Sequence, residues 1–352
     1  MKRFVAIISV LCLTFCVTGC EPKKTERTKY TDYSFDYFDT ATSIVGYEDS
    51  KEAFDAVCNE IKPLLQNYHQ LYDIYKRYNG INNLCTINDT KNGVHNPVTV
   101  DPEIIDLLKY AKEIFTLTNG STNIAMGSVL SIWHQYRTDG INNPENAQLP
   151  PMEQLKAAAE HTDINNVIID EKANTVYLSD PEMRLDVGAL AKGYATECVA
   201  QYMEQKGISG YILNVGGNVR CVGNRPDGEP WTVGIENPDK ENQEVAYAAY
   251  MHLTDEALVT SGSYQRYYTV DGQRYHHIID PNTLMPSTTF QSVSVVCGDS
   301  GLGDALSTAL FTMSYEEGLA LIERTEGAEA MWIMADGEQY VSSHFHDYTF
   351  EH

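Results

Sequence analysis

The sequence lacks the cysteine arrangements that build disulfide frameworks and thiolate metal sites. Of its eight cysteines, three lie within the first twenty residues, and the others include no Cys-x-x-Cys pair. The remaining number is odd, which argues against a disulfide framework and against a cysteine cluster for zinc. We therefore expect five unpaired and mostly packed thiols, at Cys58, Cys85, Cys198, Cys221 and Cys297.

Basic residues are also scarce. The chain has 25 Lys and Arg residues against 49 Asp and Glu residues, a formal net charge of -24. Nucleic acid is therefore an unfavourable partner, because phosphate backbones are bound by basic patches that this composition hardly supplies. An anionic ligand would need cations or backbone N–H groups gathered at one place.

Long apolar runs are absent beyond the N-terminus. None reaches the roughly 18 residues that a membrane-spanning helix needs, so the mature protein is expected to be soluble. The chain also lacks a P-loop and the Gly-x-Gly-x-x-Gly dinucleotide motif. Its 352 residues are 43% apolar, which suffices for one large core or two modest ones.

The first twenty residues have the layout of a bacterial secretory signal. Lys2 and Arg3 precede an apolar run, and small residues follow as far as Cys20. This ending is similar to the lipobox of bacterial lipoproteins, so residues 1–19 are expected to be removed and Cys20 to be lipidated. The alternative is an ordinary cleaved signal in which Cys20 is incidental. Residues 20–33 are polar and are expected to form a tether.

The remaining pattern indicates one domain over residues 34–346, with a tail at residues 347–352. Apolar residues at three- and four-residue spacing predict helices over residues 51–75 and 102–118. Residues 138–151 are rich in Asn and Pro and predict a surface connection.

Short alternating runs predict many strands and few further helices. Strands are predicted at residues 166–170, 175–178, 210–215, 231–236, 246–253, 267–270, 275–279 and 292–296, with a closing hairpin at 330–341. Helices are predicted at residues 189–205, 303–312 and 314–325. Strands and helices mixed in this way, without a regular βαβ alternation, are typical of an α+β fold.

Residues 185–195, LDVGALAKGYA, place an aspartate and a lysine around a turn that opens a predicted helix. The first turn of a helix has free N–H groups and the positive end of the dipole, which suit a phosphate, and Lys192 adds a cation. Asp186 would accept a hydrogen bond from a hydroxyl or ring N–H of the same ligand. The alternative is a helix that Asp186 caps, with Lys192 in solvent.

Two further segments are candidates for ligand contact, one through paired glycines and one through side-chain oxygens. In NVGGNVR, residues 214–220, paired glycines allow a backbone to approach a bound group closely, or simply form a tight hairpin. In GDALSTALFT, residues 303–312, Asp304 and Thr308 share one face of a helix with Ser307 adjacent, the oxygen-rich surface that Mg²⁺ prefers. Alternatively, the aspartate serves the helix dipole and the threonine packs.

Two more segments, close together in the sequence, contain hydroxyl groups and histidines. ALVTSGSYQRYY, residues 257–268, predicts a strand that ends in a Ser/Gly turn with free hydroxyl and N–H groups. In YHHIIDPNTLMP, residues 275–286, His276 and His277 must face opposite sides of a strand. One of them is therefore expected in the core or in solvent, and the other is available for chemistry.

In this order, DVGALAKGYA, LNVGGN, VTSGSYQR, HHIIDPNTLMP and GDALSTALF together resemble the ApbE family of FAD:protein FMN transferases. The similarity extends to FDTATSIV, LYDIYKRYNGINNLCTIN, TNGSTNIAMGSVLSIWH and the closing hairpin, over residues 34–342. It implies a single α+β domain of the T-fold type, with mixed or antiparallel sheets and flanking helices. Such a domain binds FAD and Mg²⁺ and transfers FMN to a Thr or Ser hydroxyl of a target flavoprotein, releasing AMP.

The resemblance also implies roles for particular residues. The metal ligands would be Asp304, Thr308 and the carbonyl of Ala189, with Ser307 a weaker or water-mediated ligand because some members have a second Asp there. His277 would transfer the proton of the target hydroxyl, and Asp304 would take part in catalysis through the metal. The residues implied to bind FAD are Tyr75, Asn123, Ile124, Ala125, Asp186, Lys192, Ser261, Gly262 and Ile279.

The expected setting is the outer face of a bacterial cell membrane. A lipid on Cys20 would hold the enzyme beside its targets, for which the resemblance suggests Rnf- or Nqr-type subunits and FMN-binding domains of extracytoplasmic reductases. Two alternatives remain: a Mg²⁺-dependent FAD pyrophosphatase that uses water as nucleophile, and a lipoprotein that binds flavin without catalysis.

Overall fold

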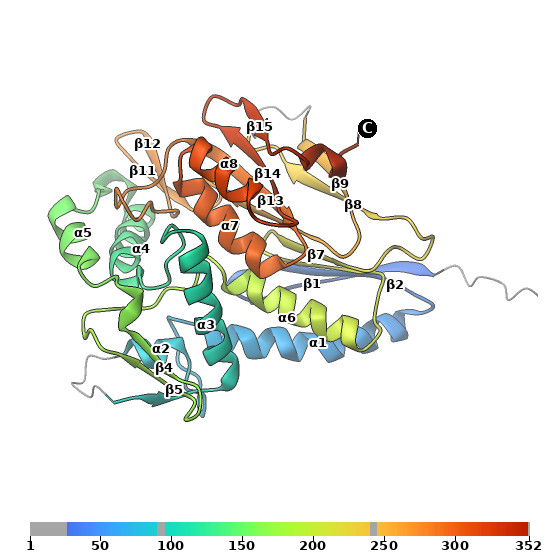
Figure 1. Ribbon diagram of the computed structural model, residues 1–352, viewed down its shortest axis with the longest axis horizontal. Coiled ribbons are helices and arrows are strands. Elements are labelled where there is room, and N and C mark those ends of the chain that lie inside the picture. The colour runs from blue at the N-terminus through green and yellow to red at the C-terminus, as the bar shows by residue number, and fades with distance from the viewer. Residues whose placement is uncertain (1–26, 90–95, 240–244, 351–352) are drawn as a thin grey trace, which may run out of the picture.

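The computed structural model describes residues 27–89, 96–239 and 245–350 (Figure 1). The predicted signal and the lipidation predicted at Cys20 lie outside these residues. Among the helices in the described ranges, none is long and apolar enough to cross a membrane.

An antiparallel sheet of eight strands forms the centre of the molecule (Figure 1). In spatial order its strands are β1 (Thr28–Tyr37), β2 (Thr40–Glu48), β6 (Tyr211–Val215), β7 (Asn218–Val222), β10 (Ala257–Gly262), β13 (Phe290–Cys297), β14 (Glu329–Met334) and β15 (Gln339–Val341). All seven pairings between neighbours are antiparallel. The predicted α+β class is confirmed.

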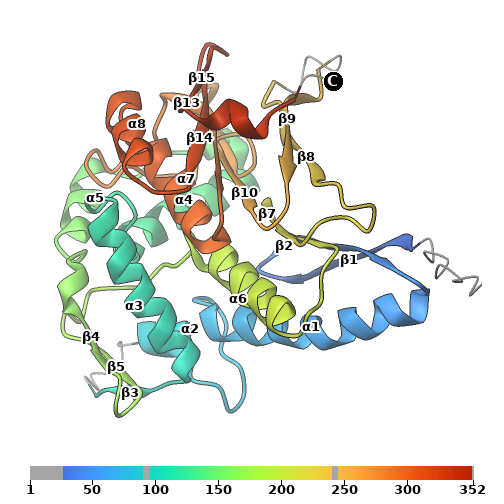
Figure 2. The same ribbon diagram turned by 45° about the vertical axis from the view of Figure 1, so that its right-hand side comes forward.

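Helices cover one face of this sheet and a β-ribbon covers the other. The helices are α1 (Lys51–Tyr72), α6 (Ala191–Gln205), α7 (Ser300–Thr312) and α8 (Tyr315–Glu323). The ribbon consists of β8 (Trp231–Glu236) and β9 (Tyr247–Leu253), and Figure 2 shows it across the sheet from α6 and α7. On neighbouring positions of β13, Val295 packs towards the helices and Val296 towards the ribbon, so both faces of the strand are buried.

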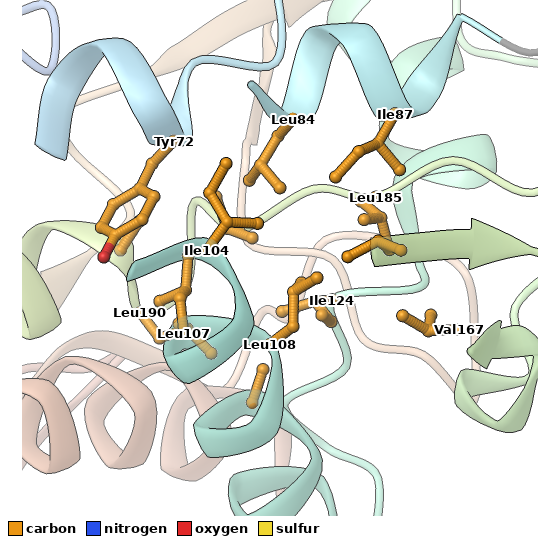
Figure 3. Packing of buried hydrophobic residues seen from close by; sticks show 14 of the residues in the cluster. Tyr72, Leu84, Ile87, Ile104, Leu107, Leu108, Ile124, Val167, Leu185 and Leu190 are labelled. Carbon is orange, nitrogen blue, oxygen red and sulfur yellow. The ribbon is translucent and has the colours of Figure 1, made fainter. Parts of the chain in front are cut away.

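A second core lies beside the sheet. It is built by α2 (Leu84–Asn88), α3 (Pro102–Leu117) and a small sheet of β3 (Val98–Thr99), β5 (Thr175–Leu178) and β4 (Val167–Asp170). Figure 3 shows Ile104 and Leu108 of α3 packed near Ile124, Leu185 and Leu190. Leu185 and Leu190 lie on either side of Asp186 in the sequence, and the carbonyl of Ile124 accepts the N–H of Asp186, so this core positions the predicted ligand-binding loop.

The remaining unit comprises α4 (Gly127–Asn142), α5 (Met152–Ala159) and the hairpin of β11 (Tyr267–Val270) and β12 (Gln273–His276). Trp133 and Tyr268 are buried here with Ile279 and Leu284. The indole N–H of Trp133 donates to the carbonyl of Leu284 at 2.9 Å. Helix α4 is therefore held against the hairpin that precedes His277. Short 3₁₀ helices complete the fold at Pro144–Asn146, Ile164–Asn166 and Phe345–Tyr348.

Most predicted elements agree with the structure, and four do not. The strand predicted at residues 275–279 is wrong beyond His276, where β12 ends. The predicted tether of residues 20–33 is wrong from Thr28 onward, because β1 pairs with β2 and Tyr30 packs on Phe54. The predicted connection of residues 138–151 is wrong at its start. There α4 continues to Asn142, because its last turn packs on Tyr268.

The predicted C-terminal tail is also partly ordered. Thr349 pairs with Met251 of β9, and the ring of Phe350 stacks on His252 with centroids 3.9 Å apart. Aromatic packing thus holds residues that composition alone assigned to a tail. The five cysteines of the described chain are free, as expected.

Candidate functional site

The close crossing of α6 and α7 organises one end of the site. A Cβ atom on Gly193 would lie 2.2 Å from the carbonyl oxygen of Ser300 and 2.5 Å from the Cβ of Asp304. Only glycine permits two helix backbones to approach this closely. The glycine of the AKG segment therefore sets the distance at which Asp304 reaches the N-terminus of α6.

Asp304 is 4% exposed, and its carboxylate is held by α6. It accepts a hydrogen bond from the N–H of Gly193 at 2.8 Å, and the Lys192 ammonium lies 3.2 and 3.3 Å from its two oxygens. Burial raises the pKa of Asp304, whereas Lys192, Gly193 and Asn218 oppose that rise. The alternative that leaves Lys192 in solvent is excluded, since its side chain is 19% exposed and paired.

The carbonyl of Ala189 belongs to the same cluster. In a regular helix the N–H of Gly193 would donate to the residue four positions earlier, which is Ala189. Here that N–H donates to Asp304 instead. Within the described chain no donor takes its place, so the Ala189 oxygen keeps its lone pairs for another partner.

Hydroxyl groups extend the cluster along α7. Ser307 is fully buried; its Oγ donates to the Asp304 carbonyl at 3.0 Å and lies 2.9 Å from the Oγ of Ser261. Thr308 is one turn beyond Asp304 and partly exposed. The structure thus brings Ser261, Ser307 and Asp304 together from β10 and α7. Gly262 ends β10 beside them.

These donors fit a Mg²⁺ site that a ligand completes. Magnesium is commonly held by one or two carboxylates together with substrate phosphates. The described residues contain no group of three or more His, Cys, Asp or Glu side chains that would hold a metal unaided. One carboxylate, a carbonyl without a donor and two hydroxyls match that arrangement, and the Lys192 ammonium shows that the carboxylate attracts a cation.

The loop that carries Asp186 is fixed from both sides. The N–H of Asp186 donates to the carbonyl of Ile124 at 2.8 Å, and its Oδ1 accepts from the N–H of Gly188 at 2.9 Å. The side chain of Asn88 bonds both backbone groups of Leu185, at 2.7 and 2.9 Å. Asp186 does not cap α6, because that helix begins at Ala191. Its pKa is raised by burial, which neighbouring donors and cations oppose.

The segment of residues 123–125 lies beside this loop with its side chains turned inward. Ile124 and Ala125 are 1% and 0% exposed and belong to the core. The amide of Asn123 donates to the carbonyl of Thr162, and its oxygen accepts from the N–H of Ala125, both at 2.9 Å. Any ligand contact by Ile124 or Ala125 would therefore use the backbone. Ile279 is 7% exposed and packs in the α4 core.

The two histidines have different surroundings, but not through strand alternation, because β12 ends at His276 and His277 lies just beyond it. His276 is buried, with its ring edge-to-face on Phe311 and its Nε2 2.5 Å from the carbonyl of Ser287. The Nδ1 of His277 is buried without a hydrogen-bond partner in the described chain. Burial lowers the pKa of His277 to about 3, and the charges of Arg266, Arg137 and Lys192 add to this effect.

Tyr75 lies near His277, at the end of the site opposite Asp304. It follows α1 and is 59% exposed, with its ring centroid 5.2 Å from that of His134 on α4. Its phenol interacts electrostatically with Asp186, Arg137 and Arg266. Tyr75, Asp186 and His277 therefore share a set of charged neighbours, although they come from distant parts of the sequence.

The structure adds residues that the sequence reasoning missed. Asn218 was quoted within the LNVGGN segment, and its side chain interacts with Asp304. Arg266 was quoted within VTSGSYQR without a role. His134 ends the segment TNGSTNIAMGSVLSIWH and Asn88 ends LCTIN, both without an expected role, and Arg137 lies in none of the segments that carry the resemblance.

Comparison with known proteins agrees with this arrangement. The family model described as the ApbE family matches residues 38–332. An FAD:protein FMN transferase of Klebsiella pneumoniae (strain 342) is 31% identical over 78% of this chain and 84% of its own. A protein of the same name from Vibrio cholerae is 29% identical over 97% of both chains.

Solved structures agree with the fold. The ApbE protein of Thermotoga maritima is 27% identical, with a TM-score of 0.79, covering 92% of this chain and 100% of that one. The flavin transferase ApbE of Vibrio cholerae is 26% identical, with a TM-score of 0.74, covering 92% and 99%. A match along most of the chain in sequence and in structure shows the family: this chain belongs to the ApbE family.

Proposed function

We propose that the protein transfers FMN from FAD to a hydroxyl group of a partner flavoprotein and releases AMP. The relatives named FAD:protein FMN transferase and the family membership support this activity. The observation that carries it is that the site combines two features. One is the buried carboxylate of Asp304 at the α6–α7 crossing, and the other is the neutral ring of His277, on which Arg137 and Arg266 act. The first suits a metal–diphosphate complex, and the second suits proton removal from a hydroxyl.

Mg²⁺ is part of this proposal. Asp304, Thr308 and the carbonyl of Ala189 would hold it, with Ser307 a weaker or water-mediated ligand. When bound, it would neutralise negative charge on the diphosphate of FAD and act as a Lewis acid. Lys192 would then be freed from Asp304 to face the ligand, as the resemblance implies.

The proton of the acceptor hydroxyl goes to His277 in this proposal. Because the pKa of its ring is about 3, His277 is neutral near pH 7 and its buried Nδ1 has no competing partner in the described chain. The acceptor oxygen forms a bond to the flavin-side phosphorus, and the bond from that phosphorus to the AMP oxygen breaks. The proton passes from His277 to the departing AMP or to solvent.

The acceptor and the location follow from the resemblance. The acceptor would be a Thr or Ser of an extracytoplasmic flavoprotein, such as an Rnf- or Nqr-type subunit or the FMN-binding domain of a reductase. A lipid on Cys20 would keep enzyme and acceptor at one membrane surface and so raise their effective concentration.

The test is to incubate the protein with FAD, Mg²⁺ and a flavoprotein domain that has an acceptor Thr or Ser. We expect flavin fluorescence that stays with the acceptor after denaturation, and none when Mg²⁺ is chelated. Free FMN without acceptor-bound flavin would instead establish the FAD pyrophosphatase. Intact FAD after incubation would favour a protein that only binds flavin.

A further inference from the structure

Arg137 is held at the His277 end of the site by α4. Its Nη2 lies 3.1 Å from the Nδ1 of His134, whose ring in turn contacts Tyr75. Burial lowers the pKa of Arg137, and the charge of Arg266 adds to this shift, whereas the phenol of Tyr75 and the carboxylate of Asp186 oppose it. A partly buried guanidinium with a histidine as its hydrogen-bond partner is therefore directed at the site.

The packing of α4 on β11 brings Arg266 to the same place. Gly140 is one helical turn beyond Arg137, and a Cβ there would lie 2.5 Å from the ring of Tyr268. Arg266 immediately precedes β11, which carries Tyr268. Arg137 and Arg266 thus lie on the two elements that meet at this contact, and each acts electrostatically on His277 and on Tyr75.

Two like charges held together need a reason, because their repulsion opposes folding. Some arginines of the described chain form ion pairs, such as Arg220 with Glu197 and Arg225 with Asp227. Arg274, which also has no such pair there, lies over the ring of Tyr267 and not beside a second arginine. Neither Arg137 nor Arg266 forms an ion pair with a carboxylate of the residues that the structure describes. In a chain with a net charge of -24, such a pair indicates a site for an anion that arrives from outside.

We propose that Arg137 and Arg266 bind the flavin-side phosphate of FAD, the phosphate that becomes the ester in the product. This inference rests on the proposed FMN transfer. A hydroxyl that attacks this phosphorus must reach both the phosphorus and its proton acceptor. The arginines beside His277 therefore lie where the attacked phosphate must be, and planar guanidinium groups match phosphate oxygens in pairs. Asp304 would hold Mg²⁺, which would supply positive charge to the rest of the diphosphate.

The experiment compares binding of FMN, riboflavin and AMP to the full chain and to the variants Arg137→Gln and Arg266→Gln. FMN differs from riboflavin only by the phosphate, so the ratio of their dissociation constants isolates the phosphate contact. We expect each variant to weaken FMN binding roughly tenfold, the size of one charge-assisted contact, and to leave riboflavin and AMP unchanged.

The matched control is Arg274→Gln. Arg274 belongs to the same hairpin, but its guanidinium lies over the ring of Tyr267, 4.9 Å from its centroid. Its FMN-to-riboflavin ratio should equal that of the wild type. Arg266 is exposed, so Arg266→Gln is expected to fold even if Arg137→Gln does not.

Two results would overturn the assignment. One is an unchanged FMN-to-riboflavin ratio in Arg266→Gln, and the other is a loss of AMP binding in place of FMN binding. Neither result depends on catalysis. Failure of FMN transfer by the wild type would instead count against the proposed function, because the binding ratio is measured without an acceptor.

Discussion

The two ends of the site differ in how their charges are compensated. At the α6–α7 crossing, the Asp304 carboxylate is buried and has the N–H of Gly193 and the ammonium of Lys192 as partners. At the α4–β11 contact, Arg137 and Arg266 form no ion pair within the described chain, although Asp186 acts electrostatically on Arg137, and the Nδ1 of His277 has no hydrogen-bond partner there.

This difference shows which end is complete before a ligand arrives. Lys192 supplies the cation that balances Asp304, so a metal there exchanges one cation for another. The arginine end has two arginines and the carboxylate of Asp186, which acts on Arg137. A phosphate there would balance the positive charge that remains. Ligand binding at the Asp304 end should therefore depend on the metal ion and on the packing of α6 against α7. Binding at the arginine end should depend on the phosphate of the ligand.

The largest expected effect is that of Asp304→Asn. Asp304 is the one carboxylate among the residues proposed to hold Mg²⁺. Its removal should lower Mg²⁺-dependent FMN transfer by roughly 10³-fold, since a metal at a developing charge contributes several kcal/mol. FAD binding should weaken but persist, because the arginine end is intact. Transfer rates at increasing Mg²⁺ concentration measure the first effect, and flavin fluorescence titration the second.

Asp299→Asn is the control on the same helix. Asp299 caps α7 by accepting the N–H of Leu302 at 2.9 Å, and Asn caps a helix equally well. This variant should keep the wild-type dependence on Mg²⁺. Full activity of Asp304→Asn would disprove the metal assignment.

The next effect is that of His277→Gln, for which we expect a loss of roughly a hundredfold in transfer rate with little change in stability. His276→Gln is the control at the neighbouring position. His276→Gln removes a ring that packs on Phe311, so it should lower the melting temperature while the folded fraction stays active. Melting curves and transfer rates of both variants measure this. If His276→Gln were the inactive one, the assignment of the two histidines would be reversed.

Gly193→Ala tests the first end through packing alone. A Cβ would meet the Ser300 carbonyl at 2.2 Å, so α6 and α7 must separate. We expect a loss of about 1–3 kcal/mol in the free energy of unfolding, with weakened Mg²⁺ dependence and unchanged riboflavin binding. Gly298→Ala is the control, because nothing lies within 4 Å of its would-be Cβ. Equal stability of the two variants would contradict the close crossing.

The smallest effect concerns pH. The pKa of His277 is about 3 in the folded protein and about 6.5 in an unfolded chain. Below pH 6.5 the unfolded state takes up the proton and the folded state does not, so this group lowers stability as pH falls towards 3. His277→Gln should therefore lose less melting temperature than the wild type between pH 7 and pH 5. An equal loss of melting temperature in the wild type and in His277→Gln would show that His277 is not held neutral in the folded protein.

Local spacing predicted the parts of the site that lie on one element. The four-residue separation of Asp304 and Thr308 placed them on one helical face. The different surroundings of His276 and His277 were expected, but they arise where β12 ends and not from alternation along a strand. Contacts between distant segments could not be predicted in this way. The pair of Lys192 and Asp304 spans 112 positions, and it exists because Gly193 lets α6 and α7 touch.

The arginine end was missed for a related reason. Arg137 stands next to residues 138–151, whose composition predicts a connection, and only tertiary packing on Tyr268 extends the helix through them. Its partners, Tyr75, Arg266 and His277, come from three other segments. Strand β1 was missed likewise, since its polar sequence is stabilised by pairing with β2 and by Tyr30 on Phe54.

The most direct test of FMN transfer is to compare AMP released with FMN covalently bound in a single reaction. Intact mass spectrometry of the acceptor domain would measure bound FMN, and chromatography would measure AMP and free FMN. The account predicts one bound FMN for each AMP, with little free FMN, and loss of both products in Asp304→Asn. AMP matched by free FMN, with an acceptor of unchanged mass, would contradict it.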